Sequence, residues 1–122
     1  MPIPAAPAGQ LVAVQALTEA TGEQVSTRLP AQPAEKFIVV SRIGGGASTF
    51  ATSDPRFLIE CYASDELLAE EFAEQVRAAW RDLRTHDVVR AYDDDNVVRQ
   101  DDPNTDTRYR FQFTGGLKIR LR

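Results

Sequence analysis

The stretch of the chain that decides the fold is residues 107–122, Thr-Arg-Tyr-Arg-Phe-Gln-Phe-Thr-Gly-Gly-Leu-Lys-Ile-Arg-Leu-Arg, where polar and apolar residues alternate on both sides of a glycine pair. The polar even positions are Arg108, Arg110, Gln112, Lys118, Arg120 and Arg122. The apolar odd positions are Tyr109, Phe111, Phe113, Leu117, Ile119 and Leu121. Successive side chains of a strand point to opposite faces, so one face of this segment is basic and the other is apolar.

The glycine pair Gly115-Gly116 limits how this segment can fold. A two-residue hairpin loop there would place Phe113 opposite Lys118 and mix apolar with charged side chains on one face. Two arrangements keep the faces separate: one long strand bent at the glycines, or a three-residue loop that pairs Phe113 with Leu117. We expect the long strand, which is longer and more two-faced than a small monomer needs for its core.

The composition indicates one folded domain. The chain has 122 residues, 43% hydrophobic and 26% charged, with a net charge of −4 at pH 7. A chain of this length can bury enough apolar surface to fold without disulfides or metals. The ordinary, slightly acidic composition disfavours nucleic acid or an acidic membrane as the main partner. Acidic residues concentrate between Ser64 and Thr105 whereas the last strand is basic, and this asymmetry suits self-association.

The compartment is indicated by cysteine usage and by the lack of targeting patterns. Cys61 is the only cysteine, so no internal disulfide can form and a reducing compartment is expected. The sequence has no run of about 18 apolar residues and no signal-peptide pattern. We expect the chain to stay in the cytoplasm in which it is made.

The first half of the chain predicts an arm, a helix, two strands and a loop. Residues 1–7 predict a flexible arm, and about residues 8–21 predict a helix that ends at Gly22. The apolar stripe expected on this helix is Leu11, Val14 and Leu17. Val25–Leu29 and Phe37–Ile43 alternate as strands, and Pro30 and Pro33 separate them. The segment Gly44–Asp54 is longer than most loops, so we expect contact with a partner through Gly44, Gly45, Gly46 and Phe50.

A central strand and a long helix follow this loop. Phe57, Ile59 and Cys61 share one face, while Leu58 is apolar on the other, which is typical of a strand covered on both faces. A helix is expected over about residues 65–83, capped by Ser64. Its apolar stripe is Leu68, Phe72, Val76, Ala79, Trp80 and Leu83.

The order of the predicted elements indicates the fold class. Val88–Tyr92 and Val97–Arg99 flank an acidic turn and predict a hairpin. The chain then reads α-β-β-β-α-β-β with a long C-terminal strand. We therefore expect residues 8–122 to form a single α+β domain, in which two helices pack on one face of a mostly antiparallel sheet.

Catalytic and cofactor signatures are weak in this sequence. His86 lies between the long helix and a strand and has no Cys or Ser partner at a recognisable spacing, so a solvated loop histidine is expected. Cys61, on a strand, is expected to be a buried small hydrophobe. Gly44-Gly45-Gly46 is followed by no lysine and opens no helix, so it is not a phosphate-binding loop. We expect no catalytic residue and no cofactor.

The acidic residues in the last third of the chain could supply oxygen ligands to a divalent cation. They are Asp93, Asp94, Asp95, Asp101, Asp102 and Asp106. Their spacing lacks the pattern of a calcium loop, so we expect turn chemistry and no metal site. A metal-dependent enzyme built on them remains an alternative. So does a nucleic-acid-binding module on the basic strand face, although its phenylalanines point away from the arginines and cannot stack bases beside them.

The whole arrangement resembles the tail terminator (tail completion) proteins of long-tailed bacteriophages. The resemblance rests on a helix followed by Gln24–Pro30, then Phe37–Gly46, then Pro55–Ala63 leading into an acidic Ala/Leu-rich helix. It closes with Thr107–Phe113 running into the alternating basic strand. The order and spacing of these motifs cover nearly the whole chain, and none of them is a catalytic signature.

The resemblance implies a structural virion protein and no enzyme. Such proteins form a homo-oligomeric ring, usually of six copies, that caps the tail-tube protein, stops tube polymerisation and joins the tail to the head–tail connector protein. DNA would pass through the ring without sequence-specific binding, and no membrane is involved. The location implied is the neck region of the virion tail, with assembly in the host cytoplasm. A head-completion or head–tail connector protein is the alternative. We expect the interface to include the basic residues Arg108, Arg110, Lys118, Arg120 and Arg122.

Overall fold

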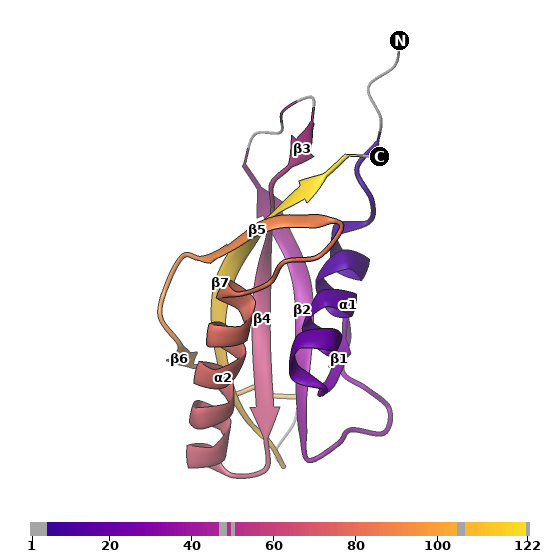
Figure 1. Ribbon diagram of the computed structural model, residues 1–122. Helices are drawn as coiled ribbons and strands as arrows, with labels where there is room; N and C mark the ends of the chain where they lie inside the picture. Colours follow the sequence, from indigo (N-terminus) through magenta and orange to yellow (C-terminus); the bar gives the residue numbers. More distant parts are fainter. Residues whose placement is uncertain (1–4, 47–48, 50, 105–106, 122) are drawn as a thin grey trace.

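The computed structural model describes residues 5–46, 49, 51–104 and 107–121. Two helices lie on one side of a single curled sheet (Figure 1). The helices are α1 (Gly9–Thr21) and α2 (Glu66–Arg81). The strands are β1 (Gln24–Ser26), β2 (Lys36–Gly45), β3 (Thr52–Ser53), β4 (Pro55–Ala63), β5 (Val88–Asp93), β6 (Val98–Arg99) and β7 (Tyr109–Arg120). The predicted α+β class and order are confirmed. The two-residue strand β3 is an addition, and β6 lies where a short strand was predicted over Val97–Arg99.

The sheet is built around the hairpin of β2 and β4 and the long strand β7. The hydrogen-bonded order is β1-β2-β4-β7-β3, and β5 and β6 also pair with β7. The β1–β2 pair is parallel and every other pair is antiparallel. β4 lies between β2 and β7, so the prediction of a central strand there is confirmed.

The long strand β7 runs along the sheet and pairs with other strands on both of its edges (Figure 1). Residues 109–116 pair with β4 and residues 119–120 pair with β3. Along its other edge β7 pairs with β6 at residues 111–112 and with β5 over residues 115–119. β7 therefore contacts four strands as one continuous element, which confirms the long-strand prediction and excludes the three-residue loop.

Gly115 and Gly116 are required where β7 bends because two side chains approach its backbone from opposite faces. A Cβ atom added to Gly115 would lie 2.5 Å from Trp80 Nε1 and 2.7 Å from the carbonyl oxygen of Tyr92. A Cβ atom added to Gly116 would lie 2.3 Å from the ring of Tyr92. Trp80 Nε1 also donates a hydrogen bond of 2.9 Å to that Tyr92 oxygen. The glycines thus let α2 and β5 pack directly on β7.

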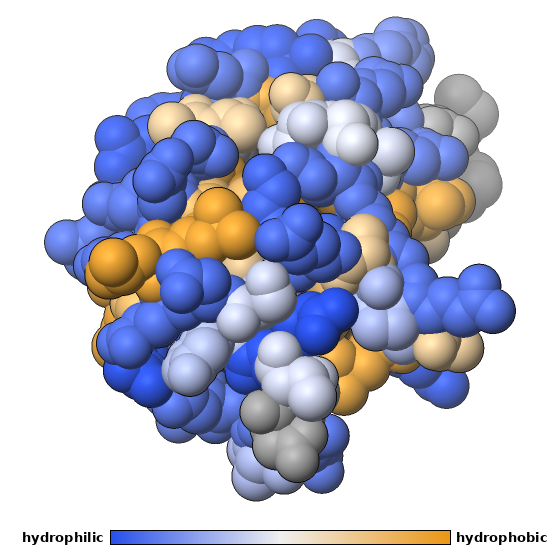
Figure 2. Space-filling model, turned by 90° about the horizontal axis from the view of Figure 1, so that it is seen from below, coloured by the Kyte–Doolittle hydropathy of each residue, from blue (hydrophilic) through white to orange (hydrophobic). Residues whose placement is uncertain are grey.

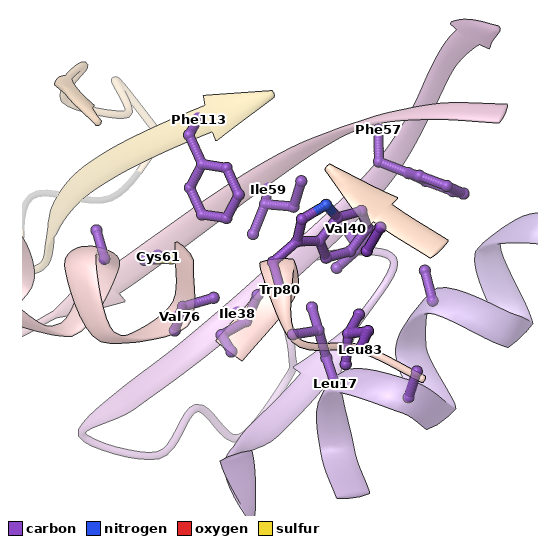
Figure 3. Close-up of a cluster of buried hydrophobic side chains, with 14 of the residues drawn as sticks. Leu17, Ile38, Val40, Phe57, Ile59, Cys61, Val76, Trp80, Leu83 and Phe113 are labelled. Carbon is purple, nitrogen blue, oxygen red and sulfur yellow. The ribbon is translucent and has the colours of Figure 1, made fainter. Parts of the chain in front are cut away.

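The core fills the space between the helices and the sheet. Trp80, which has no exposed surface, lies edge-on to Phe57 and to Phe113, with ring centroids 5.8 and 6.5 Å away (Figure 3). Leu83, just beyond α2, is also buried. The odd-numbered β7 side chains in this core are Phe111, Phe113, Leu117 and Ile119. The apolar face predicted for β7 is therefore the helix-facing side of the sheet.

The buried face of α1 differs from the predicted one. Its buried residues are Gly9, Val12, Ala13, Ala16 and Leu17. Leu11, expected on the apolar stripe, is 56% exposed. Leu17 is buried as predicted, but Val12 and the small residues Gly9, Ala13 and Ala16 complete the buried face in place of Leu11. Gly22 ends the helix in a left-handed conformation (φ 70°), as predicted.

The start of α2 is capped by Asp65 and not by Ser64. The Asp65 carboxylate accepts a 3.0 Å hydrogen bond from the backbone N–H of Leu68. Ser64 instead donates its hydroxyl to Glu35. Either residue type can cap a helix, and only the backbone path decides which side chain faces the free N–H groups. Buried residues of α2 are Ala69, Phe72, Ala73, Val76 and Trp80.

The segments around β1 and β2 also depart from the sequence expectation. β1 ends at Ser26, whose hydroxyl donates to the Arg28 carbonyl, and Leu29 is exposed. β2 extends to Gly45, which pairs with Pro55, so the predicted Gly44–Asp54 loop begins within the β2–β4 hairpin, and its residues Thr52 and Ser53 form β3 on the edge of β7. Phe50 lies outside the described residues.

The predicted hairpin of residues 88–99 does not exist. β5 and β6 do not pair with each other, and both pair with the same edge of β7. They form one interrupted edge strand, and the acidic segment between them bulges over Thr114. The backbone N–H of Asp94 donates to the Thr114 carbonyl, and the Asp95 carboxylate accepts from the Thr114 N–H. The turn residues correctly predicted where the strand is interrupted, but the strand with which each part pairs is set by tertiary contacts.

None of the described helices is long and apolar enough to span a membrane.

Candidate interaction surface

The face of the sheet that points away from both helices carries the basic residues predicted from the sequence. On this face the β7 residues Arg110, Gln112 and Lys118 neighbour side chains of β4 and β5. A small apolar cluster of Phe37, Val39 and Tyr62 also lies here, with the rings of Phe37 and Tyr62 stacked 4.6 Å apart. We call this side the outer face.

Arg110 lies within a largely buried polar network on the lower half of the outer face. Its Nη1 atom is 2.6 Å from Glu60 Oε2 and 3.8 Å from Asp102 Oδ2. The Tyr62 hydroxyl donates to Asp102 Oδ2 at 2.9 Å. The side chains of Arg110, Glu60 and Asp102 are 14%, 12% and 6% exposed. One arginine therefore neutralises two carboxylates that little water reaches. Removal of the arginine would leave buried charges unpaired and would destabilise the fold.

Burial and charge act in opposite directions on the acids of this network. Burial raises the pKa of Glu60, and the neighbouring Arg110 only partly offsets it. Burial would also raise the pKa of Asp102, but hydrogen bonds from the Asn104 N–H and the Tyr62 hydroxyl, with the charge of Arg110, lower it overall. Burial raises the pKa of Tyr62 to about 12, so its hydroxyl stays protonated and donates. Asp102 is thus the fixed anion of the network.

The segment between β6 and β7 crosses the outer face and holds this network in place. Arg110 Nε donates to the Gln100 carbonyl at 2.5 Å. Arg108 Nη2 donates to the Ala34 carbonyl at 3.3 Å. Together with the Tyr62–Asp102 bond, these contacts attach the segment to β4, to β7 and to the loop before β2. Arg108 and Arg110 are therefore engaged within the subunit, and their part in an interface stays a prediction.

The cations on the upper half of the outer face do not share a buried network of the kind that surrounds Arg110. Lys118 of β7 lies directly opposite Arg90 of β5. Arg120 donates through Nε to the His86 carbonyl at 2.9 Å, and Arg56 pairs with Asp94. Arg122 lies outside the described residues. The structure thus adds Arg90 to the surface; sequence reasoning missed it because only the register of β5 places it beside Lys118.

Asp93, Asp94, Asp101 and Asp102, which could have served as metal ligands, lie against arginines, whereas Asp95 accepts from the Thr114 N–H. Asp93 accepts from Arg77 at 2.6 Å and from Arg81 at 3.0 Å. Asp101 pairs with Arg99 at 3.1 Å. Within the described part of the chain, no group of three or more His, Cys, Asp or Glu side chains is arranged to hold a metal ion. Asp106 lies outside the described residues.

The remaining candidates lie where the sequence indicated. His86 is exposed and lines a hollow of about 230 Å³ with Glu19, Thr85 and Asp87, which contains no cysteine or serine. Cys61 is fully buried, and burial raises the pKa of its thiol far above the usual range. Gly44, Gly45 and Gly46 are exposed at the end of the β2–β4 hairpin, and their role in contacts stays a prediction.

Comparison with known proteins gives one informative likeness. No family model matches this sequence, and no curated protein matches it. A chain in the virion of a native gene transfer agent particle has a similar structure, with a TM-score of 0.56 at 17% sequence identity. The alignment covers 91% of this chain and 89% of that chain. The likeness is therefore one of fold, and it extends over the whole domain.

Proposed function

We propose that this chain is a structural protein of a phage-like virion. The observation that carries the proposal is the likeness to a virion chain, which spans nearly the full length of both proteins. The sequence resemblance to phage tail proteins was drawn from motifs alone and points to the same class of particle. The two observations rest on different properties of the chain, one on its sequence and one on its three-dimensional fold.

Within that class we propose the role of tail terminator. The chain would form a ring, with six copies as the expected number, on the last layer of the tail-tube protein. The ring would stop tube growth and present a surface to the head–tail connector protein, while DNA passes through its centre. An assembly role agrees with charged surfaces of both signs on one small subunit.

The experiment is tube growth in vitro with the tail-tube protein of the same particle. Addition of this chain at a small fraction of the tube protein should shorten the tubes and place a ring at one end, as seen by negative-stain electron microscopy. A chain that neither changes tube length nor binds tube ends, but binds the head portal complex, would be a connector and would contradict the terminator role.

A further inference from the structure

Arg90 and Lys118 form a pair of like charges on the upper outer face. They are direct cross-strand neighbours, and like charges at such positions destabilise a sheet. In the described part of the chain neither residue takes part in an ion pair, whereas Arg56, Arg77 and Arg110 each have a carboxylate within 4 Å. We call Arg90 and Lys118 the basic patch. Two neighbouring cations without a carboxylate partner are expected at a surface that binds an anionic group from outside the subunit.

The N-terminal half of α2 carries a surface of the opposite sign. Glu70 and Glu71 lie three and four residues after Leu67, and Glu74 lies three residues after Glu71, which places all four on one side of the helix. Leu67 is 73% exposed, the largest value among the exposed large apolar residues. Glu70 makes no ion pair within the described residues, and Glu74 has only a loose one, 3.7 Å from Arg77. We call these four residues the acidic patch.

The two patches lie on opposite sides of the molecule. α2 covers the inner side of the sheet, whereas the basic patch belongs to the outer face and to the upper half of β7 (Figure 1). The lower end of the molecule, from which α2 starts, shows apolar side chains between hydrophilic ones (Figure 2). The patches therefore cannot neutralise each other within one subunit, but they can do so between two copies.

We propose that the basic patch of one subunit contacts the acidic patch of the next copy of this chain. The contact joins two different surfaces and is heterologous, so its repetition generates a ring if the rotation closes. The inference rests on the proposed ring and names the faces that build it. It also gives Leu67 a role as the apolar centre of a charged contact.

A second copy fits the basic patch better than nucleic acid does. The patch contains two cations, and the whole chain has a net charge of −4, which disfavours a polyanion as its main partner. A nucleic-acid surface would also leave the exposed leucine of the acidic patch without a purpose. DNA binding is therefore treated as a competing outcome.

Charge reversal in both patches tests the contact. Arg90→Glu with Lys118→Glu gives one variant, and Glu70→Lys with Glu71→Lys gives the other. Each variant alone brings like charges together, so its self-association should weaken at least about tenfold in sedimentation velocity at low salt. An equimolar mixture of the two variants restores opposite charges at every contact and should recover assembly. Arg28→Glu with Arg42→Glu, at exposed cations elsewhere, is the matched control.

The outcomes separate this contact from the proposed function. Circular dichroism confirms that each variant is folded, and the same proteins are tested for tube capping as well as for self-association. Variants that assemble and cap like the wild type would overturn the contact and leave the terminator role intact. Wild type that assembles through these patches but does not cap tubes would overturn the role alone. Reversal of the basic patch that abolishes salt-dependent binding of duplex DNA but not assembly would assign the patch to nucleic acid. A wild-type chain that stays monomeric with and without tubes would overturn both the contact and the ring.

Discussion

The two halves of β7 carry the same alternating pattern, but among the described residues the cation of the lower half is paired with carboxylates of its own subunit and the cation of the upper half is not. In the lower half Arg110 is enclosed by Glu60, Asp102 and Tyr62 under the segment that precedes the strand. In the upper half Lys118 faces another cation, Arg90, across the β5–β7 pair. Alternation therefore determines the face to which a side chain points, while the neighbouring strand determines whether its charge is available to a partner.

The largest expected effect is at the junction of the two halves, where Trp80 packs on Gly115. Trp80→Ala removes a fully buried ring that contacts Phe57 and Phe113, and large-to-small changes of this kind cost about 3–5 kcal/mol. Urea denaturation measures the loss in free energy of unfolding. Leu67→Ala is the control, since that side chain is exposed in the free subunit. Equal stability of both variants would mean that the junction is not part of the core.

Removal of one cation from each half tests the comparison directly. Arg110→Met leaves Glu60 and Asp102 without their cation, and we expect a loss of roughly 2–3 kcal/mol, somewhat below that for a fully enclosed pair. Lys118→Met should change the free energy of unfolding by no more than about 0.5 kcal/mol. Both are measured by urea denaturation of the free subunit. Similar losses in the two variants would remove the distinction between the halves.

A smaller effect is expected when the bend itself is filled. Gly115→Ala places a methyl group against Trp80 and the Tyr92 carbonyl, and such overpacking costs about 1–3 kcal/mol. Gly46→Ala is the matched control, because the nearest atom to its added Cβ is 4.0 Å away. Thermal denaturation compares the two. If the Gly115→Ala protein is as stable as the control, Trp80 and β5 can move away from β7 at this position without a loss of stability.

The weakest effect is expected in the acid dependence of stability. The pKa of Asp102 is lowered from its ordinary value of 3.8, so its stabilising charge is fully present above that pH and is lost as the pH falls through the folded-state pKa. Asp102→Asn should therefore be less stable near neutral pH and should show a shallower decline below about pH 4. Urea unfolding between about pH 2 and pH 7 gives the slope, with Asp101→Asn as control. Identical slopes in wild type and Asp102→Asn would contradict the role of this carboxylate.

The sequence predicted well those elements whose signal is local. The alternation of residues 107–122 gave one long strand, and the spacing of Phe72, Val76 and Trp80 gave the buried face of α2. The prediction failed for part of α1, where Leu17 is buried as expected but Leu11 is exposed and Val12 and two alanines lie on the buried face. It also failed for residues 88–99, because two short strands with a turn between them read as a hairpin although both pair with a third strand.

By itself the sequence determined the α+β class, the long two-faced strand and the central position of β4, since these depend on periodicities of two or 3.6 residues along the chain. Only the tertiary structure decided which charges are free. Arg108 and Arg110 could not be distinguished from Lys118 along the strand, because their partners, Ala34, Glu60 and Asp102, are remote in sequence. Arg90 joined the surface only through the register of β5 on β7. Strand pairing brings together residues that no local pattern relates, and burial then determines how strongly their charges interact.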